Sequence, residues 1–551
     1  MRTGSGIFAR LSPVRIIWRV LHRLSQYWPY LIAALALAAR LLPTPRTIDD
    51  AFITFRYARN LLAGAGFVFN PGERVLGTTT PLYTLLMAAL AGVSGSANYP
   101  WLALIVNALA DAATCLLLVR LGEKLTGRRA VGIAASLLWA VSPMSVTFAV
   151  GGMETAVFIL LLTLSADLYL AGRTRAAALT SALLLLTRPD GVLFVGPVIL
   201  DLVWRRARER PRRAPWAEAA IFLLTLAPWA IFATLYFGSP LPHTIAAKAL
   251  AYRLPPWAAL VRLMQHYGTP FFEHLVFGNV WPLIGFILYL ILTLVGALAA
   301  VRREARTWPV ALYPWLYFVV FAAPNPLIFR WYLAPPLPFY FLLILTGIAK
   351  IAEDIARTTD DRRRTTDHRL TPAFVSHLTL HASRFVPRAS RRLPIAYCLL
   401  ALLFSLNEWV LRTDHGPQTP APDIAWHKLE LLYTEVGQEL KARVAPGTLV
   451  AAGDVGALGY YSDARILDTV GLMSPDASAY YPLDPALYVI NYAVAPQLIL
   501  DTQPDYVVLL EVYGRGGLFT DPRFLDDYEL VQKIPTNIYG SDGLLVWARH
   551  R

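Results

Sequence analysis

The sequence predicts a mainly helical integral membrane protein. We expect a bundle of about eleven transmembrane helices with amphipathic helices at the membrane surface, followed by a small extracytoplasmic α/β domain. The 551 residues are 56% hydrophobic and 16% charged, with a mean hydropathy of +0.46, whereas soluble domains carry about 25% charged residues. Apolar segments of membrane-crossing length recur along the chain up to residue 411 and are absent from residues 412–551. The chain therefore divides into a transmembrane domain, 1–411, and a C-terminal domain, 412–551.

Eleven segments approach the roughly 20 apolar residues that cross a bilayer. They are 26–43, 101–120, 130–149, 154–171, 176–188, 190–204, 216–237, 280–301, 309–324, 332–350 and 393–411. The fifth and sixth are short and are divided by "TRPDG". The two cysteines, Cys115 and Cys398, lie in apolar runs and are expected to be free thiols.

The basic residues lie in clusters between the apolar segments. The formal net charge of +13 therefore reflects membrane orientation, and no nucleic acid partner is expected. Placing the N-terminal arginines (Arg2, Arg10, Arg15, Arg19 and Arg23) in the cytoplasm also puts "EKLTGRR", "AGRTR", "WRRARERPRRAP", "VRREAR" and the loop 351–392 there. The odd number of spans then places residues 412–551 outside the cell.

Segment 81–94 is apolar but too short to span. Counting it as a span would move every later basic loop to the outside. We expect it to lie on, or dip into, the outer face, within one external loop that runs from residue 44 to residue 100.

The C-terminal domain has the pattern of short strands. The segments "GTLVAAGDVGALGYYS", "PDYVVLLEVYG", "YELVQKIP" and "GLLVWARH" are rich in β-branched and aromatic residues. Segment 424–443 has the pattern of an amphipathic helix. Asp454, Asp468, Tyr460 and Tyr461 give a composition suited to sugar contacts, although a plain strand and turn core explains them equally well.

Two adjacent acids, Asp49 and Asp50, follow the first predicted span. A structural interpretation is a helix start, because Thr47 and Asp50 have capping-box spacing and the segment 52–62 suits an amphipathic interfacial helix. One acid suffices for a cap, however, and carboxylates at membrane depth tend to be functional. Glu154 in "GGMET" and Asp190 in "TRPDG" are predicted on the same side. These acids predict a reaction site at the outer edge of the bundle.

This first external loop also carries a family resemblance. The stretch "DDAFITFRYARNLLAGAGFVFNPGERVLGTTTPLYTLL", with "GGMET", "RPDG" and "GYYSDARILDTVGLMSPD", is similar to the mycobacterial terminal arabinofuranosyltransferases. The layout resembles the GT-C class of membrane glycosyltransferases, which use polyprenyl-phosphate sugars. Phe52 stands where the family usually has Tyr, and "GTTTPL" differs from its usual loop end. The resemblance implies transfer of a sugar, arabinofuranose or another pentose, from a polyprenyl monophosphate to a cell-envelope glycan, lipid or protein.

The resemblance implies that Asp49 is the catalytic carboxylate and that Lys248 contacts the donor phosphate. A carboxylate at a helix N-terminus is expected to stay ionised, so Asp49 would accept the proton of the acceptor hydroxyl. Asp50 and Glu154 would orient Asp49, bind sugar hydroxyls or, together with Asp49, hold a divalent cation such as Mg²⁺, Mn²⁺ or Ca²⁺. The remaining candidates are His243 and Arg330 for the donor phosphate, and Arg56, Glu73, Asp190 and Tyr460 for substrate contacts.

Other interpretations remain open from the sequence. Arg188 and Asp190 could form a purely local ion pair. A transporter or flippase of a lipid-linked sugar would also be polytopic, but its acids would lie near mid-membrane. A non-catalytic scaffold that binds a cell-wall polymer is a third possibility. No Walker loop, Rossmann fingerprint, HExxH or CxxC motif is present, so an enzyme that uses soluble nucleotide sugars is not expected.

Overall fold

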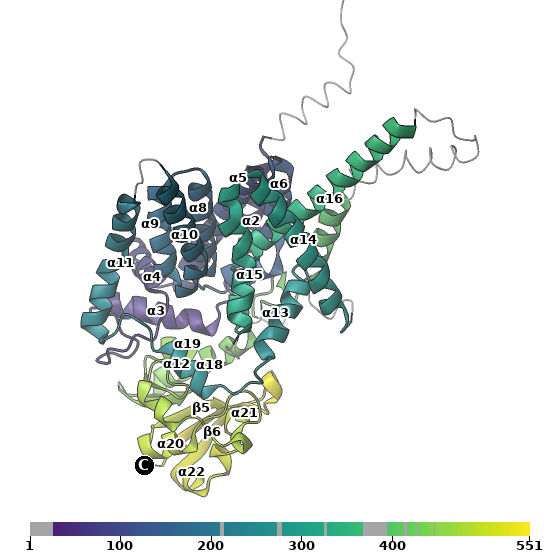
Figure 1. Ribbon diagram of the computed structural model, residues 1–551. Helices are drawn as coiled ribbons and strands as arrows, with labels where there is room; N and C mark the ends of the chain where they lie inside the picture. The colour runs from purple at the N-terminus through teal and green to yellow at the C-terminus, as the bar shows by residue number, and fades with distance from the viewer. Residues whose placement is uncertain are drawn as a thin grey trace, which may run out of the picture.

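The computed structural model shows a helical bundle standing on a C-terminal α/β unit (Figure 1). It describes residues 26–209, 214–272, 278–323, 328–366, 394–412, 416–425, 427–445 and 447–550. The N-terminal arginine cluster and most of the basic loop 351–392 lie outside the described residues.

Helices occupy all eleven predicted spans. They are α2 (Trp28–Leu41), α5 (Tyr99–Thr126), α6 (Arg129–Val141) with α7 (Pro143–Val150), α8 (Thr155–Leu170), α9 (Thr174–Thr187), α10 (Val192–Arg208), α11 (Trp216–Phe237), α14 (Trp281–Arg303), α15 (Trp308–Ala322), α16 (Leu337–Thr366) and the helix Pro394–Asn407. Within the described residues, three of them (α5, α11 and α14) are long and apolar enough to cross a membrane by themselves. The predicted positions of the helices are confirmed, whereas the count of eleven spans stays a prediction.

The predicted span 130–149 is not one straight helix. It is divided into α6 and α7, which are bent by 51° relative to each other. Pro143 is the first residue of α7, and proline lacks the N–H that a continuous helix would need. The bend brings the C-terminal end of α7 next to the start of the first external loop, where Arg46 N donates to the carbonyl of Val150 at 2.9 Å.

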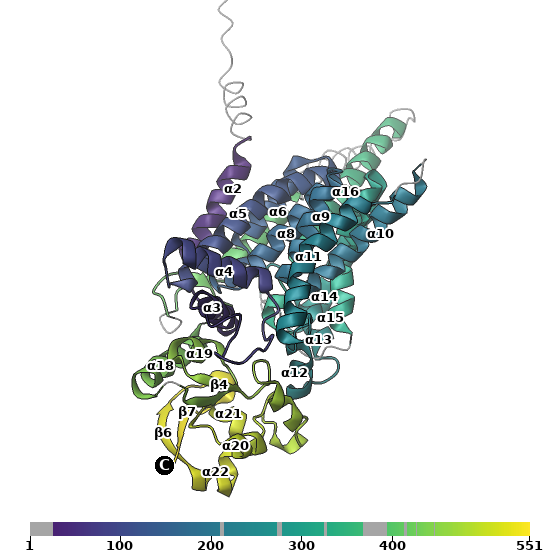
Figure 2. The same ribbon diagram turned by 90° about the vertical axis from the view of Figure 1, so that its left-hand side faces the viewer.

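Four of the predicted cytoplasmic loops meet at one end of the bundle. Gly127 lies against the guanidinium of Arg303, and Gly172 lies against that of Arg306. Arg128 also forms an ion pair with Glu353 at 2.8 Å. This end is opposite the C-terminal unit (Figures 1 and 2). The predicted orientation requires these loops to lie at one end, and the side of the membrane that this end faces stays a prediction.

The first external loop forms two helices beneath the bundle, α3 (Asp49–Leu62) and α4 (Pro81–Ser94). As predicted, α4 does not continue the bundle but crosses its lower end (Figure 2). The expectation for α3 needs correction. Most of its residues after Asp50 are buried, including Phe52, Phe55 and Tyr57, because the C-terminal unit covers the side that a membrane-lying helix would expose. The helix is an interdomain element.

The predicted capping box is absent as well. The residue that precedes α3 is Ile48, and no side chain caps the helix. Thr47 is buried, and its carbonyl accepts a hydrogen bond from the His427 ring at 3.1 Å. The two acids therefore begin the helix without serving as caps for its free N–H groups.

The C-terminal unit (residues 428–549) contains a five-stranded sheet with the order β4-β3-β5-β7-β6. Strands β3 (Leu449–Ala452), β4 (Arg465–Asp468) and β5 (Tyr506–Leu510) are parallel, and β7 (Leu544–Arg549) and β6 (Tyr528–Ile534) extend the sheet antiparallel. The predicted helix 424–443 appears as α18 (Lys428–Arg443). One expectation is wrong: only the start of "GTLVAAGDVGALGYYS" is a strand, and "GALGYYS" forms the helix α19 (Gly456–Ser462).

Helix α19 packs directly on α3. Arg56 of α3 donates to the carbonyls of Gly459 at 2.7 Å and Ala464 at 2.6 Å, while Phe52 packs against both Tyr460 and Tyr461. One hydrophobic core therefore extends from the first external loop into the sheet. The carboxyl ends of the parallel strands face the bundle across this contact, which is the edge where α/β sheets usually bind ligands.

Candidate active site

Asp49 lies where α3 meets the start of α19. Its Oδ2 accepts a hydrogen bond from the Gly456 N–H at 2.9 Å, and its Oδ1 accepts one from the Ala457 N–H at 2.8 Å. The side chain that the sequence assigned to catalysis is therefore oriented by the backbone of the C-terminal unit.

The expectation that Asp49 is fully ionised is wrong. Burial and the nearby carboxylate of Asp454 raise its pKa to about 8, and the two amide hydrogen bonds offset only part of this increase. At neutral pH the protonated form predominates. Its ionised form is correspondingly a stronger base than an ordinary aspartate, as suits a group that takes a proton from a hydroxyl.

Asp50 faces a cation. The Nζ of Lys248, on α12 (Thr244–Ala251), lies 3.7 Å from Asp50 Oδ2, and both side chains are partly exposed. The ammonium also lies 4.3 Å from the centre of the Phe329 ring, which stacks on Trp331. The predicted phosphate-binding lysine thus faces Asp50, the residue next to the predicted base Asp49, beside an aromatic wall.

Two further carboxylates come from the C-terminal unit. Asp454 follows β3 at the carboxyl edge of the sheet and accepts a hydrogen bond from the Tyr433 hydroxyl at 3.1 Å. Burial is the main cause that raises its pKa to about 6, and Asp50 contributes. Glu430 of α18 lies close enough to couple to Asp49, and burial raises its pKa to about 8. The site is acidic and is built by both parts of the chain.

Glu154 and Asp190 have a separate partner. The guanidinium of Arg188 lies 3.3 Å from Glu154 and 2.8 Å from Asp190, and Asp190 also accepts a hydrogen bond from the Tyr317 hydroxyl at 3.0 Å. All three charged side chains are at least 90% buried. The local ion pair that the sequence allowed is present and includes Glu154. These two acids are accordingly committed to a buried network next to the site.

The proposed cation ligands do not form a metal site. Within the described residues, no group of three or more His, Cys, Asp or Glu side chains is placed to hold a metal ion. Asp49 is turned to backbone amides, Asp50 to Lys248 and Glu154 to Arg188. This donor arrangement does not fit the expected cation.

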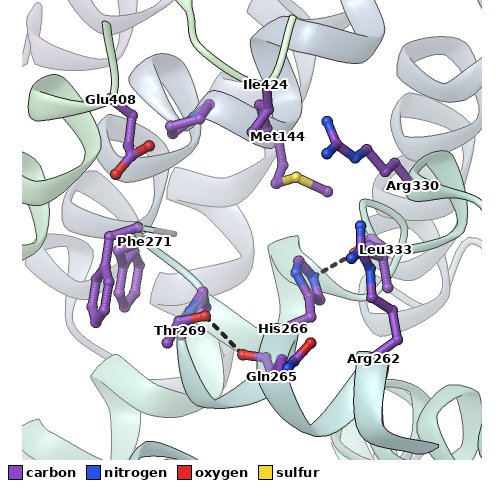
Figure 3. Close-up of a pocket in the computed structure, with 13 residues that line it drawn as sticks. Met144, Arg262, Gln265, His266, Thr269, Phe271, Arg330, Leu333, Glu408 and Ile424 are labelled. Atoms are coloured by element: carbon purple, nitrogen blue, oxygen red, sulfur yellow. Dashed lines mark hydrogen bonds between the residues drawn. The ribbon is translucent and has the colours of Figure 1, made fainter. Parts of the chain in front are cut away.

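Arg330 lines a neighbouring pocket, shown in Figure 3. The pocket encloses about 610 Å³ of empty space, part of it open to solvent, and Lys248 and the carboxylates above are not among its lining residues. Arg330 and Arg262 lie on one wall and Glu408 on the opposite one. His266 of α13 (Ala258–Gly268) is held by the Leu333 carbonyl at 2.8 Å, and burial lowers its pKa to about 4. Arg330 nevertheless stands between Phe329 and Trp331, whose ring centres lie 4.3 and 5.7 Å from the Lys248 Nζ, so this pocket adjoins the Lys248 site.

The remaining predicted residues join the two parts of the chain. His243 lies 3.3 Å from the Ser478 hydroxyl. Arg56 is buried on α19 carbonyls, and Glu73 forms an ion pair with Arg465 at 2.5 Å. Tyr460 is 9% exposed and packs on Phe52 and under Arg59. The polar atoms of Arg56, Glu73 and Tyr460 are engaged at the interface between the first external loop and the C-terminal unit. His243 contacts the same unit from the start of α12.

The sequence did not identify Glu430 or Gly456 as part of the site. Glu430 stands in an ordinary amphipathic helix pattern, and nothing in its neighbourhood indicates burial. Gly456 offered a weak signal in the glycine-rich "GDVGALG", which was interpreted as a turn. Phe329 was not singled out, and Trp331, like Tyr332, has the pattern of an interfacial anchor at a helix end, a common role for aromatic residues.

Comparisons with known proteins agree with this arrangement. Residues 422–547 match a family described as "Domain of unknown function (DUF8728)". The chain is 30% identical over 245 residues to the terminal β-(1→2)-arabinofuranosyltransferase of Mycobacterium tuberculosis, which is 40% of this chain and 38% of the relative. It is 28% identical over 235 residues to the enzyme of the same name from Corynebacterium glutamicum, which is 36% of this chain and 33% of that relative. The matches thus span little more than a third of the relatives' length.

Two solved structures match almost the whole chain. ArnT from Cupriavidus metallidurans bound to undecaprenyl phosphate has a TM-score of 0.56 at 12% identity, over 96% of this chain and 98% of ArnT. The oligosaccharyltransferase of Archaeoglobus fulgidus has a TM-score of 0.51 at 12% identity, over 96% of this chain and 74% of that one. At such low identity the likeness shows the fold alone. The chain has the GT-C fold of an integral membrane protein and resembles terminal arabinofuranosyltransferases.

Proposed function

We propose that this protein is a membrane glycosyltransferase that moves a pentose from a polyprenyl monophosphate to a cell-envelope acceptor on the extracytoplasmic side. The names of its relatives favour arabinofuranose as that pentose. The observation that carries the proposal is that Lys248 faces Asp50 while the adjacent Asp49 is held by backbone amides. Transfer of a glycosyl phosphate needs a base for the acceptor and a cation for the leaving group, and the site offers both.

In the proposed reaction, the oxygen of an acceptor hydroxyl bonds to the anomeric carbon of the donor sugar. The bond between that carbon and the phosphate oxygen breaks, and the electron pair leaves with the polyprenyl phosphate. The ionised Asp49 carboxylate takes the hydroxyl proton. The Lys248 ammonium, 3.7 Å from Asp50, stabilises the negative charge that develops on the phosphate. Asp50 holds the ammonium in place until the phosphate arrives.

The donor class has independent support. ArnT has the same fold and is described with bound undecaprenyl phosphate, and the relatives are named for the transfer of arabinofuranose. The apolar helices of the bundle provide a surface for a polyprenyl chain. The acceptor would approach from the side of the C-terminal unit, whose carboxylates Asp454 and Glu430 suit hydrogen bonds from sugar hydroxyls.

The test uses the purified full chain in lipid nanodiscs. It is incubated with a panel of radiolabelled polyprenyl-phosphate sugars and an arabinan oligosaccharide as acceptor. We expect label to appear in the oligosaccharide with the arabinofuranosyl donor and to disappear with the Asp49→Asn variant. Absence of transfer from every donor, together with movement of labelled lipid across the bilayer of proteoliposomes, would instead identify a flippase.

A further inference from the structure

The start of α19 approaches Asp49 more closely than any side chain would permit. A Cβ placed on Gly456 would lie 1.9 Å from the Asp49 carbonyl oxygen and 2.8 Å from Asp49 Oδ2. Gly456 has no positive φ, so its backbone conformation does not require glycine. The reason for glycine at this position is the contact with Asp49.

This contact uses both oxygens of the carboxylate. Each accepts one backbone N–H, from Gly456 at 2.9 Å and from Ala457 at 2.8 Å. Two donors on adjacent residues fix the plane of a carboxylate, because rotation about its Cβ–Cγ bond would break both hydrogen bonds. Each oxygen keeps a second lone pair for another partner. The group is therefore held in place and can still accept a proton.

The rest of α3 and α19 keeps the two residues in register. Arg56 donates to Gly459 and Ala464 carbonyls, and Arg59 donates to the Tyr460 carbonyl at 2.9 Å. These contacts lie about two to three turns beyond Asp49 along α3. The position of the Gly456 amide relative to Asp49 is consequently set by the docking of the whole C-terminal unit.

We infer that Gly456 and Ala457 are positioning residues of the transfer reaction, whose backbone N–H groups hold the Asp49 carboxylate toward the acceptor hydroxyl. This inference rests on the proposed function. It makes the C-terminal unit a part of the catalytic machinery, since the group that fixes the base belongs to it. Rate should then depend on Gly456 even though its own atoms do not touch the donor.

The test is Gly456→Ala in the full chain, assayed for kcat, donor KM and binding of polyprenyl phosphate. The methyl group must push Asp49 from its place, so we expect kcat to fall by about 10²-fold, the scale of a 1 Å misplacement. Donor KM and polyprenyl phosphate binding should stay within about threefold, because Lys248 is untouched. A general loss of folding would lower kcat and binding together, so a fall in kcat with binding retained indicates a positioning effect.

Two control variants distinguish positioning from docking. Asp463→Asn removes the ion pairs of Asp463 with Arg59 at 2.5 Å and Lys441 at 2.6 Å. It leaves in place the arginine hydrogen bonds to backbone carbonyls that keep α3 and α19 in register. Gly196→Ala adds the same methyl group in α10, where nothing lies within 4 Å of a Cβ. Both should retain kcat. A loss of kcat with Asp463→Asn equal to that with Gly456→Ala would overturn the inference.

A second variant serves if Gly456→Ala does not give monodisperse protein. Asp49→Glu keeps the carboxylate but lengthens the side chain, so it cannot meet both amides from the same backbone position, and kcat should again fall with binding retained. Normal kcat in Asp49→Glu or in folded Gly456→Ala would refute the positioning role. If Asp49→Asn is inactive in the same assay, the proposed function stands; if Asp49→Asn is active, the assignment of Asp49 fails by itself.

Discussion

Replacement of Asp49 by asparagine separates the catalytic from the structural role of this side chain. Both carboxylate oxygens accept backbone N–H groups, at 2.9 and 2.8 Å. Asparagine retains one acceptor, but its NH₂ group must face the other N–H. One hydrogen bond is lost and a buried donor is left unpaired, which costs about 1–3 kcal/mol of stability. The substitution is therefore not structurally neutral, and activity must be expressed per folded molecule.

The expected increase in the activation free energy is larger than this loss of folding stability. Removal of a positioned general base lowers the rate by roughly 10²–10⁴-fold, which corresponds to about 2.7–5.4 kcal/mol in the activation free energy. Wild-type kcat should rise as the pH increases through about 8, because the Asp49 pKa is raised to about 8 and only the ionised form accepts a proton. The Asn variant should lose this pH dependence.

The assay is single-turnover transfer from a saturating polyprenyl-phosphate sugar, followed between pH 5.5 and pH 9.5. Polyprenyl phosphate binding and thermal unfolding are measured on the same samples, so that the fraction of folded protein is known. Near-normal turnover by folded, donor-binding Asp49→Asn protein would refute both the residue assignment and the mechanism. A low rate with the wild-type pH dependence intact would assign the base to another group.

Three further predictions concern the surroundings of the site. Lys248→Ala and Arg330→Ala should each reduce donor use, and the double variant should be non-additive if both cations touch one phosphate; effects that add within about 0.5 kcal/mol would count against a shared site. Arg188→Leu leaves two buried carboxylates without a counter-charge, so stability should fall by about 3–5 kcal/mol, and an unchanged melting temperature would contradict the network. In a variant without native cysteines, a membrane-impermeant maleimide added to intact cells should label Asp526→Cys and not Arg208→Cys, both exposed positions; the reverse labelling would invert the predicted topology.

The sequence determined where the helices lie. Every predicted span coincides with a helix or a bent helix pair, because apolar segments of this length satisfy their own backbone hydrogen bonds only as helices. Strands β5, β6 and β7 were likewise found from their β-branched and aromatic residues. These signals are local, so they can be read from neighbouring residues. The predictions from sequence failed where contacts between distant segments determine the structure. The segment "GALGYYS" forms a helix against α3, and α3 itself is covered by the C-terminal unit.

The candidate site shows the same division. The sequence singled out Asp49, Asp50 and Lys248, and the structure brings them together. It could not indicate that Asp49 meets two amides 407 and 408 residues further along the chain, or that Glu154 pairs with Arg188. The raised pKa of Asp49 also depends on burial and on Asp454. Residue type and spacing fixed which chemistry is available, whereas desolvation and contacts between distant segments, which only packing creates, decided how each group is oriented and charged.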